Sequence, residues 1–215
     1  FPGTIVFFVF GGVFFADSLP FPRRKVYTIS VVYRYNTLVF YHIREETAMS
    51  VIDKIKAKAK QNVKHIVLAE GSEPRTVQAA RLITDQGIAR VTLLGAPEAI
   101  ARVAGETGTD LTGVAQIDPK TSEKAGAYAS LLFELRKAKG MTEEQATALV
   151  TGDPLYYGAV MVKSGDADGM VAGAINSTGN VLRPALQIIK TAPGIKVVSG
   201  AFIMEVPDKQ YGDNG

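Results

Sequence analysis

The chain has 215 residues, of which 47% are hydrophobic and 21% are charged, a composition typical of a globular protein with a sizeable core. It contains no cysteine, which excludes a disulfide framework, thiolate metal sites and a cysteine nucleophile in this chain. Its net charge of +3 comes mostly from residues 1–48, and the remaining charges are interspersed. The absence of a basic stripe argues against a nucleic-acid partner.

Residues 1–48 differ in composition from the rest of the chain. They hold most of the aromatic residues and no methionine, and the first methionine is Met49. We therefore expect residues 1–48 to be upstream or leader sequence outside the fold, with Met49 as the native start. The apolar run at residues 3–16 leaves two alternatives, a secretory signal and a membrane-surface segment. No basic residue precedes this run, and Asp17 ends it before it could span a membrane, so no membrane association is expected.

A first helix is expected over residues 49–61, with Ser50 as its cap and a short apolar face of Val51, Ile52 and Ile55. From residue 64 onward, short apolar runs alternate with helical patterns. Strands are predicted at 64–70, 88–95, 113–119, 169–174 and 196–206. Helices are predicted at 71–87, 96–108, 121–140, 142–150, 155–165 and 182–192.

This alternation predicts an α/β fold, in which helices cover both faces of a parallel sheet. Several helix starts carry recognisable caps: Ser72 before Pro74, the capping box of Thr142 and Gln145, and Asp153 before a proline. The last predicted strand is followed directly by polar turn residues, with no helix to cover it. We therefore expect the fold to be truncated at its C-terminus.

Candidate binding residues lie in the loops that follow the strands, because ligands of open α/β sheets bind beyond the carboxyl ends of the strands. Four such loops are present, at residues 69–75, 94–98, 117–124 and 172–184. Arg75 and Arg183 each stand where a helix is predicted to begin, with Pro184 as a first helical residue. An arginine is unfavourable at the positive end of a helix unless an anion is bound there.

The loop at residues 172–184 is the stronger candidate for an anion site. Gly173, Ala174 and Gly179 would let the backbone approach a ligand, and Ser177 and Thr178 add hydroxyl donors. The alternative is purely structural: Arg183 bonds a neighbouring carboxylate and Ser177 only caps a helix. The same alternative applies to Arg75, and to Arg136, whose position at a helix end suits a basic residue.

Seven stretches of the chain resemble phosphate acetyltransferases, the phosphotransacetylase family, in the order in which the family has them. They are IVLAEGSEPRTVQAA, GIARVTLLG, IDPKTSEK, ELRKAKGMT, GDADGMVAGAINST, LRPALQIIKTAPG and MEVPDKQYGDNG. The resemblance covers about residues 49–215, the N-terminal portion of such a protein. It implies a fold similar to isocitrate and isopropylmalate dehydrogenases, with an incomplete first domain at 49–195 and the start of a second at 196–215.

The activity implied by the resemblance is reversible transfer of an acetyl group between coenzyme A and phosphate. Coenzyme A is then a substrate, acetyl phosphate or phosphate the other, and no bound cofactor or metal is expected. Family arginines matching Arg136 and Arg183 bind the anionic substrates, and Arg75, Gly173, Asn176, Ser177 and Thr178 are the other candidate contacts. A cytoplasmic homodimer is expected for the full-length protein.

The resemblance also implies that the catalytic residues, an Asp base and a Ser-Arg pair, lie beyond residue 215, so we expect this chain by itself to be inactive. Asn176 stands where histidine is expected in many relatives, and an asparagine cannot transfer a proton near neutral pH. Two alternative functions remain open: phosphate butyryl transfer, and a binding or regulatory module as in the tail of a malic enzyme.

Overall fold

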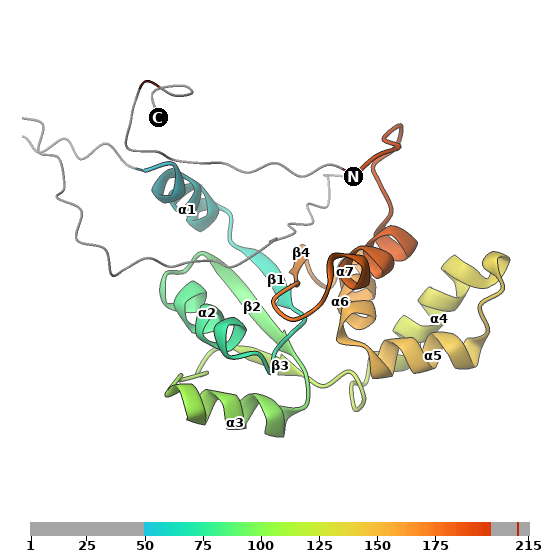
Figure 1. Cartoon of the computed structure of the whole chain (residues 1–215), viewed down its shortest axis with the longest axis horizontal. Helices are drawn as coiled ribbons and strands as arrows, with labels where there is room; N and C mark the ends of the chain where they lie inside the picture. Colours follow the sequence, from blue (N-terminus) through green and yellow to red (C-terminus); the bar gives the residue numbers. More distant parts are fainter. Residues whose placement is uncertain (1–49, 199–209, 211–215) are drawn as a thin grey trace, which may run out of the picture. The chain divides into compact units, whose positions relative to one another are not determined.

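The computed structural model describes residues 50–198 and residue 210 (Figure 1). The chain divides into two compact units, and the described residues from Lys56 to Val198 belong to one of them. Residues 50–55 and 210 belong to the other unit. The candidate site lies entirely in the first unit.

The first unit is built on a parallel four-stranded sheet, as the sequence predicted. Its strands are β1 (Lys64–Leu68), β2 (Ala89–Leu94), β3 (Ala115–Ile117) and β4 (Gly169–Val171), in the order β3-β2-β1-β4. The central strand β1 pairs with β2 and β4, so that Ile66 is opposite Val91 on one side and Gly169 on the other. Because all strands are parallel, their carboxyl ends share one edge of the sheet.

Helices follow the strands, and the predicted pattern of elements is largely confirmed. The helices are α1 (Val51–Gln61), α2 (Pro74–Asp85), α3 (Pro97–Thr107), α4 (Ala125–Arg136), α5 (Glu143–Gly152), α6 (Pro154–Ser164) and α7 (Thr178–Pro184). A 3₁₀ turn (Lys137–Lys139) extends α4, and a π-helical turn (Ala185–Ile189) extends α7. The caps predicted at Ser50, Thr142 with Gln145, and Asp153 are all present.

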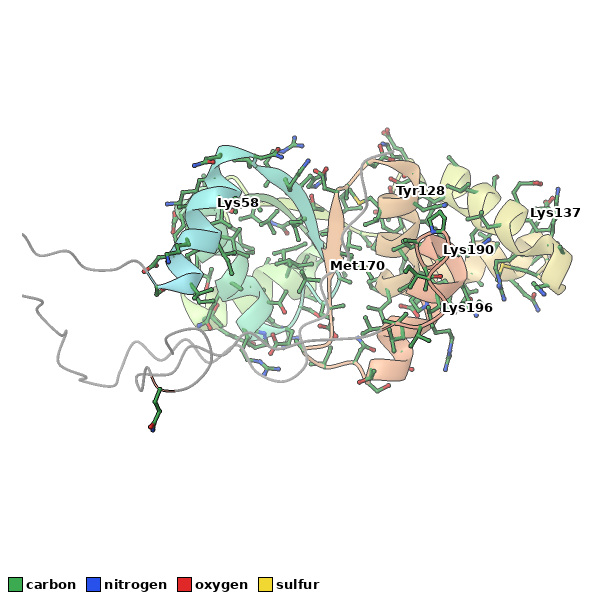
Figure 2. All side chains as sticks on the ribbon, turned by 90° about the horizontal axis from the view of Figure 1, so that it is seen from above. Lys58, Tyr128, Lys137, Met170, Lys190 and Lys196 are labelled. Atoms are coloured by element: carbon green, nitrogen blue, oxygen red, sulfur yellow. The ribbon has the colours of Figure 1, made fainter. Side chains whose placement is uncertain are left out.

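Helices cover both faces of the sheet because successive strand residues point to opposite faces. Leu68 of β1 packs in a core with residues of α2 and α3, while Val67 packs in a second core with α4, α5 and α6. Figure 1 shows α2 and α3 on one side of the strands and α6 on the other. Tyr128 and Met170, labelled in Figure 2, belong to the second core.

The cap of α2 is Glu73, not Ser72 as predicted. Pro74 occupies the first turn of the helix, and the Glu73 carboxylate accepts hydrogen bonds from the backbone N–H and hydroxyl group of Thr76 at 2.8 and 3.1 Å. Glu73 is buried, and Arg75 balances its charge. A glutamate rarely caps a helix, and this tertiary setting explains why sequence rules missed it.

The prediction that Pro184 begins a helix is wrong. Ser177 has extended backbone angles and its hydroxyl accepts from the N–H of Asn180, so α7 begins at Thr178. Pro184 has no N–H to donate within the helix. The chain continues as a π turn, in which the N–H of Lys190 reaches the carbonyl of Ala185 at 2.9 Å. Arg183 therefore lies inside the helical segment, where α7 passes into the π turn, and not at the start of a helix.

The strand predicted at residues 196–206 is not seen where the structure can test it. Residues 196–198 have no regular secondary structure, and residues 199–206 lie outside the described part of the chain. A strand is stabilised by hydrogen bonds to a neighbouring strand, and the described sheet ends at β3 and β4.

Candidate functional site

The loops that follow β1 and β4 meet at the carboxyl edge of the sheet, where a buried carboxylate joins them. Glu70 follows β1 and is only 7% exposed. Its carboxylate accepts five hydrogen bonds from the loop after β4. The donors are the backbone N–H groups of Gly173 (2.9 Å), Ala174 (2.7 Å), Ile175 (3.2 Å) and Asn176 (2.9 Å), and the side-chain Nδ2 of Asn176 (2.8 Å).

This arrangement keeps Glu70 charged. Burial by itself raises the pKa of the Glu70 carboxyl, but the hydrogen bonds from the Asn176 side chain and from the loop amides outweigh it, and the pKa lies below its ordinary value of 4.5. The run of amides begins at Gly173, whose φ of 109° is open to glycine and strained for other residues. The loop does hold an anion, as its composition suggested, and that anion is a side chain of the same protein.

Arg75 ties the same loop from its other side. Its Nε donates to Glu73 Oε1 at 2.6 Å, and its Nη2 donates to the backbone carbonyl of Ala174 at 2.9 Å. The structural alternative weighed for Arg75, a bond to a neighbouring carboxylate, is therefore present in the structure. Its guanidinium is nevertheless largely exposed.

Gly71 allows the first loop to pass directly over the end of β2. Its N–H donates to the carbonyl oxygen of Leu94 at 3.0 Å, and a Cβ atom at this position would lie 2.6 Å from that oxygen. Any side chain here would displace either the loop or the strand. Gly71 therefore fixes the position of Glu70 beside the loop after β4.

Two of the predicted arginines lie within electrostatic range of one buried tyrosine. Arg183 is exposed, and among the described residues its side chain forms no hydrogen bond or ion pair; Arg136 has a buried Nε with no hydrogen-bond partner. Both charges act on the buried phenol of Tyr156. Burial is the largest influence and raises the Tyr156 pKa, while the charges of Arg183 and Arg136 oppose that rise.

Tyr156 is held in place by the π turn. Its hydroxyl donates to Oε1 of Gln187 at 3.0 Å. Tyr156 lies in the first turn of α6, Arg136 is the last residue of α4 and Arg183 lies in α7, so this group of residues depends on three separate helices. Neither Glu70 nor Tyr156 was singled out from the sequence. A carboxylate at the end of an apolar strand, directly before a glycine, was the available signal for Glu70.

Ser177 and Thr178 are both exposed. In the sequence they directly follow the loop that binds Glu70 and precede Arg183. The Ser177 hydroxyl accepts from the N–H of Asn180 at 3.3 Å and so caps α7, which leaves its proton available to donate. Asn176 points its amide at Glu70. Gly179 has open space around it, so its approach to a ligand stays a prediction.

The paired aspartates of the GDADG sequence have structural partners at the opposite edge of the sheet. Asp166 accepts from Lys124 and Tyr128, both at 2.6 Å, and the Lys124 bond is the main reason that its pKa is lowered to about 2. Asp168 accepts from the N–H of His65 at 2.8 Å. Within the described residues, no group of three or more potential metal ligands is found.

Comparison with known proteins identifies the family. The model of the phosphate acetyl/butaryl transferase family matches residues 50–213. The chain belongs to this family. It is 54% identical over 167 residues to a phosphate acetyltransferase of Acetivibrio thermocellus, covering 78% of this chain and 49% of the relative. It is 51% identical to one of Thermoanaerobacterium thermosaccharolyticum, covering 78% and 50%.

A solved transferase of the family agrees with the fold. The crystal structure of a phosphotransacetylase from Streptococcus pyogenes matches with a TM-score of 0.70 at 34% identity, covering 75% of this chain and 50% of that one. The chain thus spans about half the length of these three proteins. No helix in the described part of this chain has the length and apolarity needed to cross a membrane.

Proposed function

We propose that the protein transfers an acetyl group reversibly between coenzyme A and inorganic phosphate. In the direction of thioester formation, the coenzyme A sulfur attacks the carbonyl carbon of acetyl phosphate, the carbon–sulfur bond forms and the bond to the phosphate oxygen breaks. The thiol proton passes to a base and phosphate leaves. Coenzyme A is a substrate of this reaction. The names of the relatives, phosphate acetyltransferases at 54% and 51% identity, support the acetyl group over a longer acyl chain.

The observation that carries the proposal is the pair of arginines beside Tyr156. Acetyl phosphate, phosphate and coenzyme A are all anions, and a guanidinium with free N–H groups is well suited to a phosphate. Arg183 has no partner among the described side chains, and the buried Nε of Arg136 is unsatisfied. A bound anion would supply acceptors to guanidinium groups that lack them. We place the anion at these arginines.

The remaining candidates lie in the loop after β4 or, in the case of Arg75, in α2 beside that loop. Ser177 and Thr178 present hydroxyl groups at the surface, and Arg75 keeps guanidinium N–H groups beyond those bound to Glu73 and Ala174. Gly173 and Asn176 direct their donors at Glu70. Their part in the proposed site is to shape the loop.

The proposal concerns the activity of the whole protein, because the matched relatives are about twice as long as the matching segment. In it, residues 49–195 form a first α/β domain, residues 196–215 begin a second, and two copies associate in the cytoplasm. The first experiment measures thioester formation from coenzyme A and acetyl phosphate, on this chain and on the chain extended through its downstream reading frame. Activity of the extended protein, greater with acetyl than with butyryl phosphate, is the expected result. No activity in either protein contradicts the proposal and favours a binding module.

The two arginines are tested by Arg183→Ala and Arg136→Met in the extended protein. Each loses charge-assisted hydrogen bonds of about 1.5–3 kcal/mol, so the KM for acetyl phosphate or coenzyme A should rise by roughly 10- to 100-fold. Thermal stability should hardly change, because neither guanidinium has a protein partner to lose. Arg90→Ala, an exposed arginine of β2, is the matched control. Unchanged KM values in both variants would return these arginines to a structural role.

A further inference from the structure

Four successive backbone N–H groups converge on one carboxylate in the loop after β4. Such a run of amides is a concave anion site of the kind that elsewhere binds phosphate. Here the Glu70 side chain fills it, with all five donor distances between 2.7 and 3.2 Å. The anion belongs to residue 70 and the donors to residues 173–176, so the contact joins the ends of β1 and β4.

The carbonyl side of the same loop is held from the same segment of chain. Arg75 donates to the Ala174 carbonyl, and the buried Glu73 carboxylate fixes the Arg75 Nε. Ala174 thus has its N–H held by Glu70 and its carbonyl held by Arg75. Bonds on both sides of the loop restrict its shape, and both bonds are charge-assisted.

The loop leads directly into the proposed anion site. Asn176, which donates to Glu70 from both its backbone and its side chain, is followed immediately by Ser177, Thr178 and the helix that carries Arg183. We infer that Glu70 is a positioning residue of the transferase site, whose carboxylate holds the loop at 173–176 in the shape that places Ser177, Thr178 and Arg183 for the anionic substrate. The inference rests on the proposed function.

A competing role for Glu70 makes the opposite prediction. A carboxylate in an anion site could occupy the place of a substrate phosphate, and its removal would then strengthen substrate binding. The burial of Glu70 and its five bonds favour a permanent tie.

The experiment compares Glu70→Gln, Glu70→Asp and the wild type in the extended protein. Glutamine keeps the shape of the side chain, but it carries no charge and turns an NH₂ group toward N–H donors. We expect the KM for acetyl phosphate to rise on the order of 10-fold in Glu70→Gln, with a smaller change in kcat, because the loop that receives the anion loses its shape. Peptides covering residues 173–176 should exchange their amide hydrogens faster. Glu70→Asp, which keeps the charge, should recover part of both effects.

Glu106→Gln removes an exposed carboxylate of α3 and serves as the control, with unchanged KM and exchange. A lower KM in Glu70→Gln would overturn the inference in favour of the competing role. If the KM is unchanged and kcat falls only as much as the fraction of folded protein falls, Glu70 stabilises the fold and does not position the loop for the substrate. If the wild type forms no thioester, the proposed function itself fails, while the exchange measurement still reports whether Glu70 holds the loop.

Discussion

At the scale of single residues, the charged side chains of the candidate site fall into two kinds, those with hydrogen-bond partners and those without. Glu70 has every acceptor position directed at donors, and its neighbour Arg75 is shared between a carboxylate and a carbonyl. Arg136 and Arg183 have no such partners in the described structure. An unsatisfied guanidinium gains most from an added anion, which is why the proposal assigns the anion to Arg136 and Arg183 and a supporting role to the satisfied charges.

The first residue-scale prediction concerns acid stability. The pKa of Glu70 is lower in the folded chain than its ordinary value of 4.5, so its contribution is fully present above that value and is lost as pH falls through the lower folded pKa. Glu70→Gln should therefore cost about 1–3 kcal/mol of unfolding free energy at neutral pH, and the cost should shrink on acidification. Denaturant titrations between pH 7 and pH 3 measure it. A cost that stays constant down to pH 3 would contradict the bonded carboxylate.

At the scale of elements, α6 is the central helix of the first unit. Its residues from Leu155 to Val162 are all buried, and a helix that is apolar on all sides must be covered on all sides. Gly158 lies where α6 crosses β4. A Cβ atom there would lie 2.7 Å from the Met170 sulfur and 3.3 Å from a methyl carbon of Leu94. The absence of a side chain sets the distance between helix and sheet.

Two glycine-to-alanine substitutions test this packing. Gly158→Ala should destabilise the fold by about 1–3 kcal/mol, because the added methyl group overpacks the core. Gly105→Ala in α3, where a Cβ atom would meet nothing within 4 Å, should stabilise it by about 0.5–1 kcal/mol through lower chain entropy. Thermal unfolding of both variants gives the comparison. Equal effects at the two positions would show that helix propensity, and not packing, decides them.

At the scale of the whole molecule, the described surface carries apolar side chains around the π turn. Leu182, Leu186, Ile189 and Val198 line a shallow pocket, and Leu186 and Val198 are each nearly half exposed. Exposed apolar patches of this kind mark surfaces that other parts of a protein or a partner cover.

Leu186→Lys tests whether this patch governs the behaviour of the chain expressed by itself. The substitution should lower the fluorescence of a bound hydrophobic dye and reduce self-association in size-exclusion chromatography, with little loss of stability. Leu82→Lys, which changes an exposed leucine of α2 outside the pocket, is the matched control. An equal dye signal from both variants would mean that the apolar surface that binds the dye lies elsewhere.

Local chemistry explains which parts of the structure the sequence predicted. Apolar runs predicted the four strands of the described sheet, and the caps at Ser50, Thr142 and Asp153 were found because a cap and the N–H it serves are only two or three residues apart. The cap of α2 and the start of α7 were missed. The sequence pattern does not show the feature on which each of them depends. For the cap of α2 this feature is the ion pair between Arg75 and Glu73, and for α7 it is the π turn that follows Pro184.

The sequence by itself determined the parallel α/β sheet, the family and the arginines to consider. Periodicity, turn residues and family motifs are properties of neighbouring residues, so they can be recognised in the sequence without a structure. Only the tertiary structure decided which charges are already satisfied. Glu70 and the amides that bind it are more than 100 residues apart, and the charges of Arg136 and Arg183 both act on Tyr156 because α4 and α7 both pack against α6. Hydrogen bonding acts over about 3 Å in space, and separation along the chain carries no information about it.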